Sequence, residues 1–171
     1  MRISALLGAI TPVCCQIRLL VLTFEQYESL TFLYVGDCIE TFVIFEEEAI
    51  FDKLQVLCDA SGSCSKMKVS IDNKTSLDTG EILCNAQFAC NDMFILIDNM
   101  QCMKINVECN ETWSCYGLSI DIKNGYDTNQ TELFVNISCY FVSACTDMII
   151  TTRNGIYTFI TLNIYQYSEN V

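Results

Sequence analysis

Hydrophobic and polar residues alternate with a period of two along most of the chain. Leu133, Val135 and Ile137, for example, are separated by single residues and lead into Cys139. A period of two places side chains on one face of a β-strand, whereas a helix face needs a period of 3.6. No segment keeps a helical period long enough for a stable helix. The pattern therefore predicts an all-β protein made of short strands.

The strands belong to a repeat that is marked by pairs of cysteines. Each of four copies contains two cysteines separated by five residues, and the second cysteines, at positions 64, 90, 115 and 145, are spaced by 26, 25 and 30 residues. Mostly apolar residues follow at the third, fifth and seventh positions after the second cysteine. They are Met67, Val69, Ile71; Met93, Ile95, Ile97; Leu118, Ile120, Ile122; and Met148, Ile150, Thr152. A degenerate copy is centred on Cys38 and a further one on Cys15.

Short strands that recur about every 25 residues without crossover helices predict a parallel β-helix, or β-solenoid. One rung would contain a strand leading into the first cysteine, a corner, a second strand and a polar return, and about six rungs would stack at roughly 4.8 Å. A leucine-rich-repeat-like solenoid is the alternative, because its apolar spacing overlaps this one. That architecture would expose Ile71, Ile97 and Ile122, and it has no place for the paired cysteines.

The domain organisation follows from the repeat. Residues 25–171 form a single predicted β-helix domain, and residues 1–24 are either a signal peptide or a degenerate N-terminal rung. No stretch reaches the roughly 18 to 20 uninterrupted apolar residues of a membrane-spanning helix. We therefore expect no clear membrane span.

Composition points to a compartment and excludes some partners. The chain of 171 residues has a net charge of −12 and no histidine, which argues against nucleic acid as a partner. Four triplets fit the N-glycosylation pattern, at Asn73, Asn110, Asn129 and Asn136. Together with 12 cysteines they favour a secreted or cell-surface protein, in which disulfides are stable.

Three uses of the paired cysteines are open from the sequence. Metal binding and redox catalysis usually show tighter C-x2-C pairs, so we favour a disulfide across each corner. The predicted pairs are Cys58–Cys64, Cys84–Cys90, Cys109–Cys115 and Cys139–Cys145. A stack of reduced cysteines and pairing between rungs are the alternatives. Cys14, Cys15, Cys38 and Cys102 lie outside the repeat pattern, and their pairing stays open.

Acidic residues offer one weak candidate for a metal site and none for catalysis. Asp72 and Asp98 occupy the same repeat position on neighbouring rungs, which makes them a weak candidate for calcium. At the next two rungs Lys123 and Arg153 replace the aspartate, a mixture that is typical of a solvated surface. We assign no catalytic residue and predict no other cofactor.

Aromatic and terminal residues suggest surfaces for partners. Trp113, Phe88 and Phe141 lie at nearby corner positions and could contact sugar rings or a surface protein, with simple corner packing as the alternative. The strongly alternating tail would finish the stack, and its free edge could pair end to end with another chain.

The C-x5-C repeat over residues 32–153 resembles the cysteine-rich β-helix repeats of predicted secreted or surface proteins from protists and algae. The resemblance implies a right-handed β-helix, and the wider pectin-lyase-like superfold implies carbohydrate association by analogy. We therefore expect a secreted or cell-surface scaffold with a structural, adhesive or binding role. A polysaccharide-active hydrolase or lyase that uses rung-aligned aspartates is the first alternative, and a fragment of a larger surface solenoid is the second.

Overall fold

The structure is a computed structural model of the 171-residue chain, and part of that chain is described below. The described residues are 3–10, 19–22, 26–34, 42–45, 50–71, 76–98, 101–123, 133–141, 143–153 and 158–165. Within them no helix is long and apolar enough to cross a membrane.

The described residues form thirteen strands in two parallel sheets. Odd-numbered strands build the first sheet: β1 (Ile3–Ile10), β3 (Gln26–Tyr34), β5 (Ile50–Cys58), β7 (Ser76–Cys84), β9 (Gln101–Cys109), β11 (Leu133–Cys139) and β13 (Thr158–Ile164). Even-numbered strands build the second: β2 (Leu19–Leu22), β4 (Phe42–Phe45), β6 (Lys68–Ile71), β8 (Phe94–Asp98), β10 (Ser119–Lys123) and β12 (Ile149–Arg153). One odd and one even strand make a rung.

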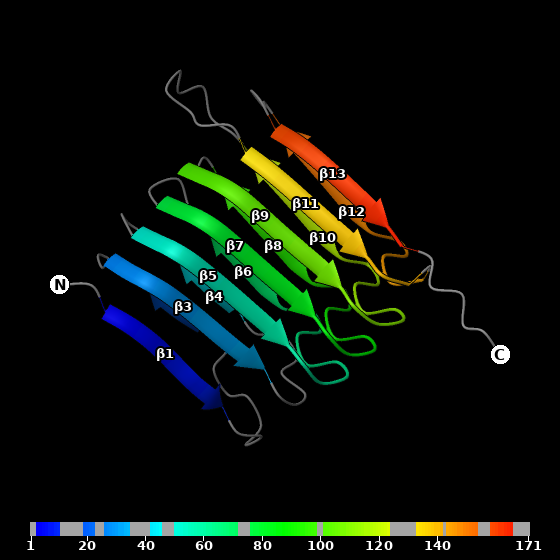
Figure 1. The fold of residues 1–171 in the computed structure, drawn as a ribbon, viewed down its shortest axis with the longest axis horizontal. Helices are drawn as coiled ribbons and strands as arrows, with labels where there is room; N and C mark the ends of the chain where they lie inside the picture. The colour runs from blue at the N-terminus through cyan, green and yellow to red at the C-terminus, as the bar shows by residue number, and fades with distance from the viewer. Residues whose placement is uncertain are drawn as a thin grey trace.

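The rungs stack as a right-handed parallel β-solenoid, as predicted. Figure 1 shows the odd strands in front, all running toward the same edge, and the even strands returning behind them while the chain advances from β1 to β13. Six pairs of strands and a final single strand lie within the described residues, slightly more than the six rungs expected. The chain carries a C-x5-C corner in four of these rungs.

Alternation along the strands creates the core between the two sheets. Strand β11 has every second residue buried, and its buried residues Val135 and Ile137 have no exposed area. Because parallel neighbours are paired in register, like residues stack from rung to rung: Val69 pairs with Ile95, Ile95 with Ile120, and Ile120 with Ile150. The core is therefore a set of apolar ladders that run along the solenoid.

The buried ladders also decide against the leucine-rich-repeat alternative. Ile71, Ile97 and Ile122 would face solvent in that architecture, but each is at most 2% exposed here. They point between the sheets, in register with one another along β6, β8 and β10. The seventh position after the second cysteine is thus a core position.

The N-terminal residues include two of the strands. Strands β1 and β2 pair in parallel with β3 and β4 at the start of the two sheets. Removal of residues 1–24 as a signal peptide stays a prediction.

Candidate functional site

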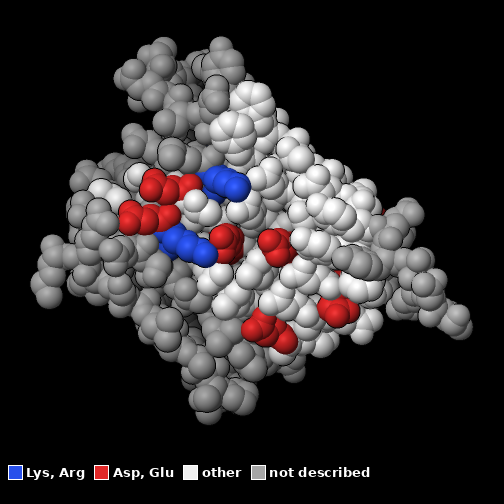
Figure 2. Space-filling view, in the orientation of Figure 1, with Lys and Arg blue, Asp and Glu red and all other residues white. Residues whose placement is uncertain are grey.

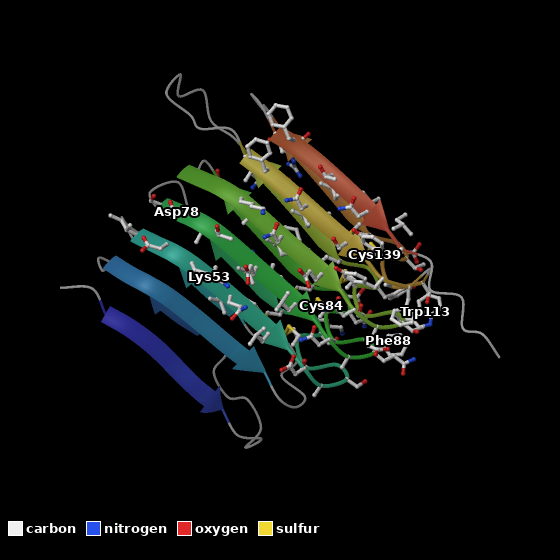
Figure 3. All side chains as sticks on the ribbon, viewed as in Figure 1. Lys53, Asp78, Cys84, Phe88, Trp113 and Cys139 are labelled. Atoms are coloured by element: carbon white, nitrogen blue, oxygen red, sulfur yellow. A yellow bond between two sulfur atoms is a disulfide. The ribbon has the colours of Figure 1, made fainter. Side chains whose placement is uncertain are left out.

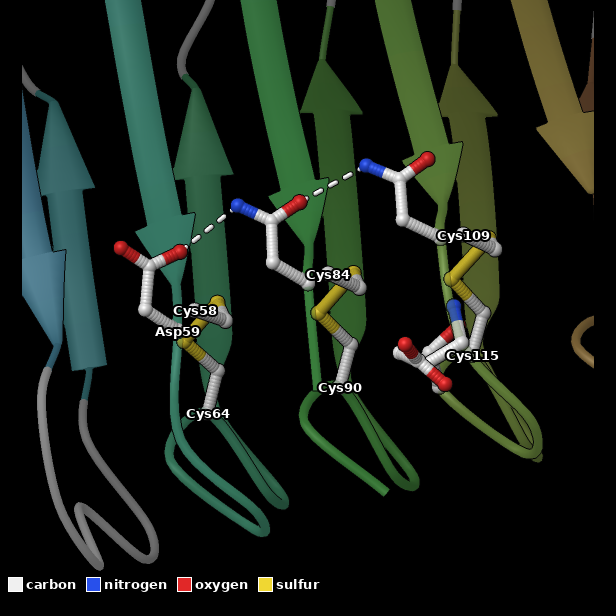
Figure 4. Close-up of a disulfide and its surroundings, with 11 residues drawn as sticks. Cys58, Asp59, Cys64, Cys84, Cys90, Cys109 and Cys115 are labelled. Atoms are coloured by element: carbon white, nitrogen blue, oxygen red, sulfur yellow. Dashed lines mark hydrogen bonds between the residues drawn. A yellow bond between two sulfur atoms is a disulfide. The ribbon is translucent and has the colours of Figure 1, made fainter. Parts of the chain in front are cut away.

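Four disulfides line one edge of the solenoid, one in each C-x5-C corner. The predicted pairs are all present, with Cα–Cα distances of 5.8 to 6.0 Å; they are Cys58–Cys64, Cys84–Cys90, Cys109–Cys115 and Cys139–Cys145. Each bond joins the end of an odd strand to the chain that leads into the following even strand (Figure 4). Seven of the eight cysteines are at most 1% exposed, and Cys145 is half-buried. Each corner is therefore tied to the core.

Three overlapping β-turns form the backbone of each corner. In the second corner the amides of Ala89, Asn91 and Met93 donate to carbonyls three residues earlier, at 3.1, 3.2 and 3.2 Å. The residue before the second cysteine is Ser or Ala in all four corners, and it is completely buried each time; these residues are Ser63, Ala89, Ser114 and Ala144. A small side chain at this position lets the chain turn against the core.

Hydrogen bonds between corners hold neighbouring rungs in register. The amide of Cys64 donates to the carbonyl of Ala89 at 2.7 Å, and the amide of Lys66 donates to Asn91 at 2.8 Å. The same two bonds recur from the second corner to the third and from the third to the fourth. The parallel pairing of the sheets thus continues around the corner, where these amides and carbonyls find partners.

Left-handed backbone conformations occur at two positions in each of the first three corners and at one described position in the fourth. Two residues after the second cysteine, φ is positive at Lys66, Asp92, Gly117 and Asp147. Two residues before it, φ is 71° at Gly62, 56° at Phe88 and 57° at Trp113. Glycine adopts this conformation without cost, whereas a bulky aromatic residue there is uncommon. The sequence does not predict the left-handed conformations of these two residues, because neither Phe nor Trp is a turn former.

Those conformations place two of the three predicted aromatic residues at equivalent positions. Phe88 is 39% exposed and Trp113 is half-buried, with its ring edge-on to Tyr116 at a centroid distance of 5.7 Å. Figure 3 shows both side chains at the corner edge of the solenoid. Phe141 lies two residues earlier in its own corner and packs against the core. Phe88 and Trp113 therefore occupy equivalent corner positions, and Phe88 is the more exposed of the two.

A ladder of polar side chains runs beside the disulfides. Asn85 donates its amide to the Asp59 carboxylate at 2.6 Å, and Asn110 donates to the Asn85 oxygen at 2.7 Å (Figure 4). All three residues directly follow the first cysteine of their rung. At the next positions Tyr140 and Tyr165 stack with their centroids 4.9 Å apart. In this way the residues after the first cysteine form one outward line along the edge.

Two of the four predicted glycosylation sites lie in the described residues. Asn110 belongs to the ladder just described, and Asn136 on the outward face of β11 donates to Asn106 at 3.2 Å. Asn73 and Asn129 lie outside the described residues. Glycosylation at all four stays a prediction.

The predicted line of aspartates on the second sheet gives way to basic residues within the described part of the chain. Asp98 is in register with Lys123, and Lys123 with Arg153, so basic residues follow it in the sheet. Asp72 lies outside the described residues, and the calcium site and the polysaccharide-active alternative stay predictions. The sequence alone does not indicate the pair of Asp121 and Arg153, whose Oδ2 and Nη2 atoms are 3.3 Å apart across neighbouring strands.

One corner tyrosine has a shifted pKa. The Tyr116 hydroxyl bonds to the Asp147 carboxylate, and this bond, together with the negative charges of Asp147 and then Asp92, raises the pKa of Tyr116 above its ordinary value. Both aspartates occupy the left-handed position two residues after the second cysteine. The third corner has glycine there, and a Cβ on Gly117 would contact the Asp92 carboxylate.

Sulfur atoms come close together but do not form a metal site. The Sγ atoms of Cys109, Cys139 and Cys145 lie within 4.8 Å of one another, and all three belong to disulfides. A disulfide sulfur offers no thiolate, which is the form that binds metal. Cys102 lies in β9 opposite Leu77, while Cys14, Cys15 and Cys38 lie outside the described residues.

The whole chain was compared with known protein families, with curated proteins and with solved structures, and none of them matches it significantly.

Proposed function

We propose that the chain is a secreted or cell-surface scaffold, held rigid by disulfides, which presents its corner edge and sheet faces for binding. The observation that carries the proposal is the buried disulfide in each of four consecutive corners. Disulfides of this kind persist in oxidising compartments and not in a reducing cytosol. A stack of four favours function outside the cell.

The corner edge is the best candidate for the binding surface. Phe88 and Trp113 hold left-handed backbone conformations that cost energy for bulky residues, and such strain tends to persist where a function requires it. Aromatic rings beside amide and carboxylate groups suit the faces and hydroxyl groups of sugars. Phe88, Trp113, Asn85 and Asp59 supply these groups along one edge. We therefore propose carbohydrate as the ligand class.

The compartment is tested by producing the chain with a secretory leader in eukaryotic cells and, in parallel, in the cytosol. We expect the secreted form to be oxidised, folded and shifted in mass by an N-glycosidase. A secreted product that carries free thiols, or a cytosolic product that folds equally well when fully reduced, would argue against the proposal.

The binding surface is tested separately on a glycan array with the oxidised protein. We expect Trp113→Ala and Phe88→Ala to reduce the signal about fivefold or more, since the stacking of a ring on an aromatic side chain contributes roughly 1 to 3 kcal/mol. Phe134→Ala is the matched control, because Phe134 is 42% exposed but lies on β11, away from the corner. Equal loss in the control, or no binding by the parent protein, would contradict carbohydrate recognition at this edge.

A further inference from the structure

The two sheets end unequally at the C-terminal side. Strand β13 is the seventh strand of the first sheet, whereas β12 is the sixth and final described strand of the second. Within the described residues, no strand lies opposite β13 and none pairs with its outer edge. The described stack therefore ends in a step that is one strand high.

Apolar side chains occupy the inner side of this step. Ile160, Leu162 and Ile164 are in register with Val135, Ile137 and Cys139, so they point the same way, toward the space between the sheets. The three residues of β11 are at most 1% exposed, but those of β13 are 42, 48 and 60% exposed. A core-facing row is thus open to solvent.

The edge also lacks the usual protection against pairing. Exposed edge strands are normally blunted by charged residues, proline or a bulge, but β13 reads TFITLNI and pairs with β11 without a register shift. Figure 2 shows this part of the face without charged side chains. An uncharged, regular edge above an open apolar row is suited to contact with another strand.

We propose that a second copy of the chain covers this end, in a tail-to-tail dimer with a two-fold axis parallel to the strands and midway between the sheets. Rotation about this axis exchanges the two sheets. It therefore places β13 of each copy in the empty position beside β12 of the other. The step on each copy fills the step on its partner, because the first sheet is longer by one strand.

Strand directions agree with this arrangement. The two sheets run in opposite directions (Figure 1), so each β13 meets the other copy's β12 antiparallel. Antiparallel pairing satisfies the edge backbone groups of both strands. The seven strands of one sheet are then followed by six of the other copy, on both sides of a continuous core. Ile160, Leu162 and Ile164 face their own counterparts across that core.

The size of the end is sufficient for a modest dimer. A seven-residue strand is about 23 Å long and two packed sheets with their side chains are about 20 Å thick, so the two ends together would bury roughly 1,000 Å², the lower limit for a specific interface. A two-fold contact is also closed, whereas a head-to-tail contact would continue into filaments. We therefore expect a dimer that does not grow further.

The association is tested by light scattering after gel filtration of the oxidised 171-residue chain over a range of concentrations. We expect a transition from one chain mass to twice that mass, with no larger species. Leu162→Lys should shift the transition at least about tenfold in concentration, because a charge would enter the centre of the apolar row. Ile164→Lys provides a second variant at the most exposed position of the row.

Ile50→Lys is the matched control, since Ile50 is 39% exposed on β5 and distant from the end. It should leave the dimer unchanged. Circular dichroism and the disulfide map check that each variant folds. A monomeric parent protein at the highest concentration, open-ended oligomers, or a dimer unaffected by both lysine variants would overturn the proposal.

Hydrogen exchange tests the geometry of the dimer. If each β13 pairs with the other copy's β12, dimer formation slows exchange in both Ile149–Arg153 and Thr158–Ile164, relative to Leu162→Lys. Slowing in β13 alone would mean that the two β13 strands pair with each other. That result would reject the interlocked arrangement.

Discussion

The middle rungs and the C-terminal end are built from the same residue pattern but bury it differently. Ile137 on β11 has no exposed area, whereas Leu162, its in-register neighbour on β13, is 48% exposed. Both side chains point toward the space between the sheets. The difference is that Ile137 has a strand on each side and an opposite sheet, and Leu162 is at the end of the described stack.

Core-facing side chains in a solenoid are buried by the neighbouring rungs. Stability in repeat proteins is close to a sum of intrinsic and nearest-neighbour contributions, so an end residue lacks about half of its contacts. The middle rungs also have the disulfide corners, with their stacked hydrogen bonds. The middle rungs are therefore held by both the corners and the neighbouring rungs.

The largest expected effect comes from removing the same kind of side chain in the two regions. Ile137→Ala should lower the free energy of unfolding by about 2 to 5 kcal/mol, because it opens a cavity in a closed core. Leu162→Ala should cost less than about 1 kcal/mol in dilute, monomeric protein, since the side chain is already half exposed. Urea unfolding of both variants measures the difference. Equal losses of stability in the two variants would contradict the claim that neighbouring rungs supply the burial.

Removal of one corner disulfide should have the next largest effect. The double substitution Cys84→Ala with Cys90→Ala should lower the free energy of unfolding by about 2 to 3 kcal/mol through the chain entropy of a short loop. Thermal unfolding under oxidising conditions measures it. The parent protein in reductant is the control and should melt at least as low as the double variant. Coincident melting of the oxidised parent and the double variant would show that the corner adds no stability.

A single methyl group added at Gly117 tests whether the corner backbone tolerates a side chain in its left-handed conformation. Gly117→Ala should cost about 1 to 2 kcal/mol, because φ is 66° there. The added Cβ would also contact the Asp92 carboxylate. Asp92→Ala combined with Gly117→Ala is the control and should recover the part due to the contact. A fully stable Gly117→Ala protein would mean that the corner adjusts easily, unlike the core.

The side-chain ladder beside the disulfides should contribute less. Asn85→Ala removes the donor to Asp59 and the acceptor for Asn110, and we expect a loss of about 0.5 to 1.5 kcal/mol. Gln87→Ala, at an exposed position of the same corner, should change stability by less than about 0.5 kcal/mol. Chemical unfolding compares the two variants. A larger loss for Gln87→Ala would contradict a stabilising ladder.

The smallest effect is the alkaline titration of Tyr116. Its pKa is raised by the hydrogen bond to Asp147 and by the nearby negative charges. The stabilising contribution is therefore fully present below the ordinary tyrosine pKa and is lost as the pH rises through the raised pKa. The ultraviolet titration difference between the parent and Tyr116→Phe isolates this group. Asp147→Asn should lower its pKa, and an unchanged titration would contradict the assignment.

The fold could be predicted because the same pattern of residues recurs in each rung. The period of two, the C-x5-C spacing and the apolar positions after Cys64, Cys90 and Cys115 define the strands and corners that the structure shows. Features that depend on backbone conformation or on contacts with a neighbouring rung could not be predicted from the sequence. The pair of Asp121 and Arg153 forms only once β10 and β12 are in register.

The candidate binding edge was predicted in part for the same reason. The sequence placed Phe88, Trp113 and Phe141 together because all three lie near the cysteines. Their positions relative to the second cysteine differ, however, and that offset turns Phe141 toward the core. The left-handed conformations of Phe88 and Trp113 oppose the preferences of those residues and could be found only in the structure.

Non-reducing peptide mapping tests the central claim, that each of the four C-x5-C corners closes on its own disulfide, most directly. Trypsin cleaves after Lys53, Lys66, Lys104, Lys123 and Arg153, so it releases each C-x5-C pair in a different peptide. We predict that each C-x5-C pair is oxidised within its own peptide. The peptide with Cys84 and Cys90 also contains Cys102, so fragmentation of that peptide identifies the bonded pair. Peptides joined across rungs, such as one containing Cys64 linked to one containing Cys90, or free thiols at these eight positions, would contradict the account.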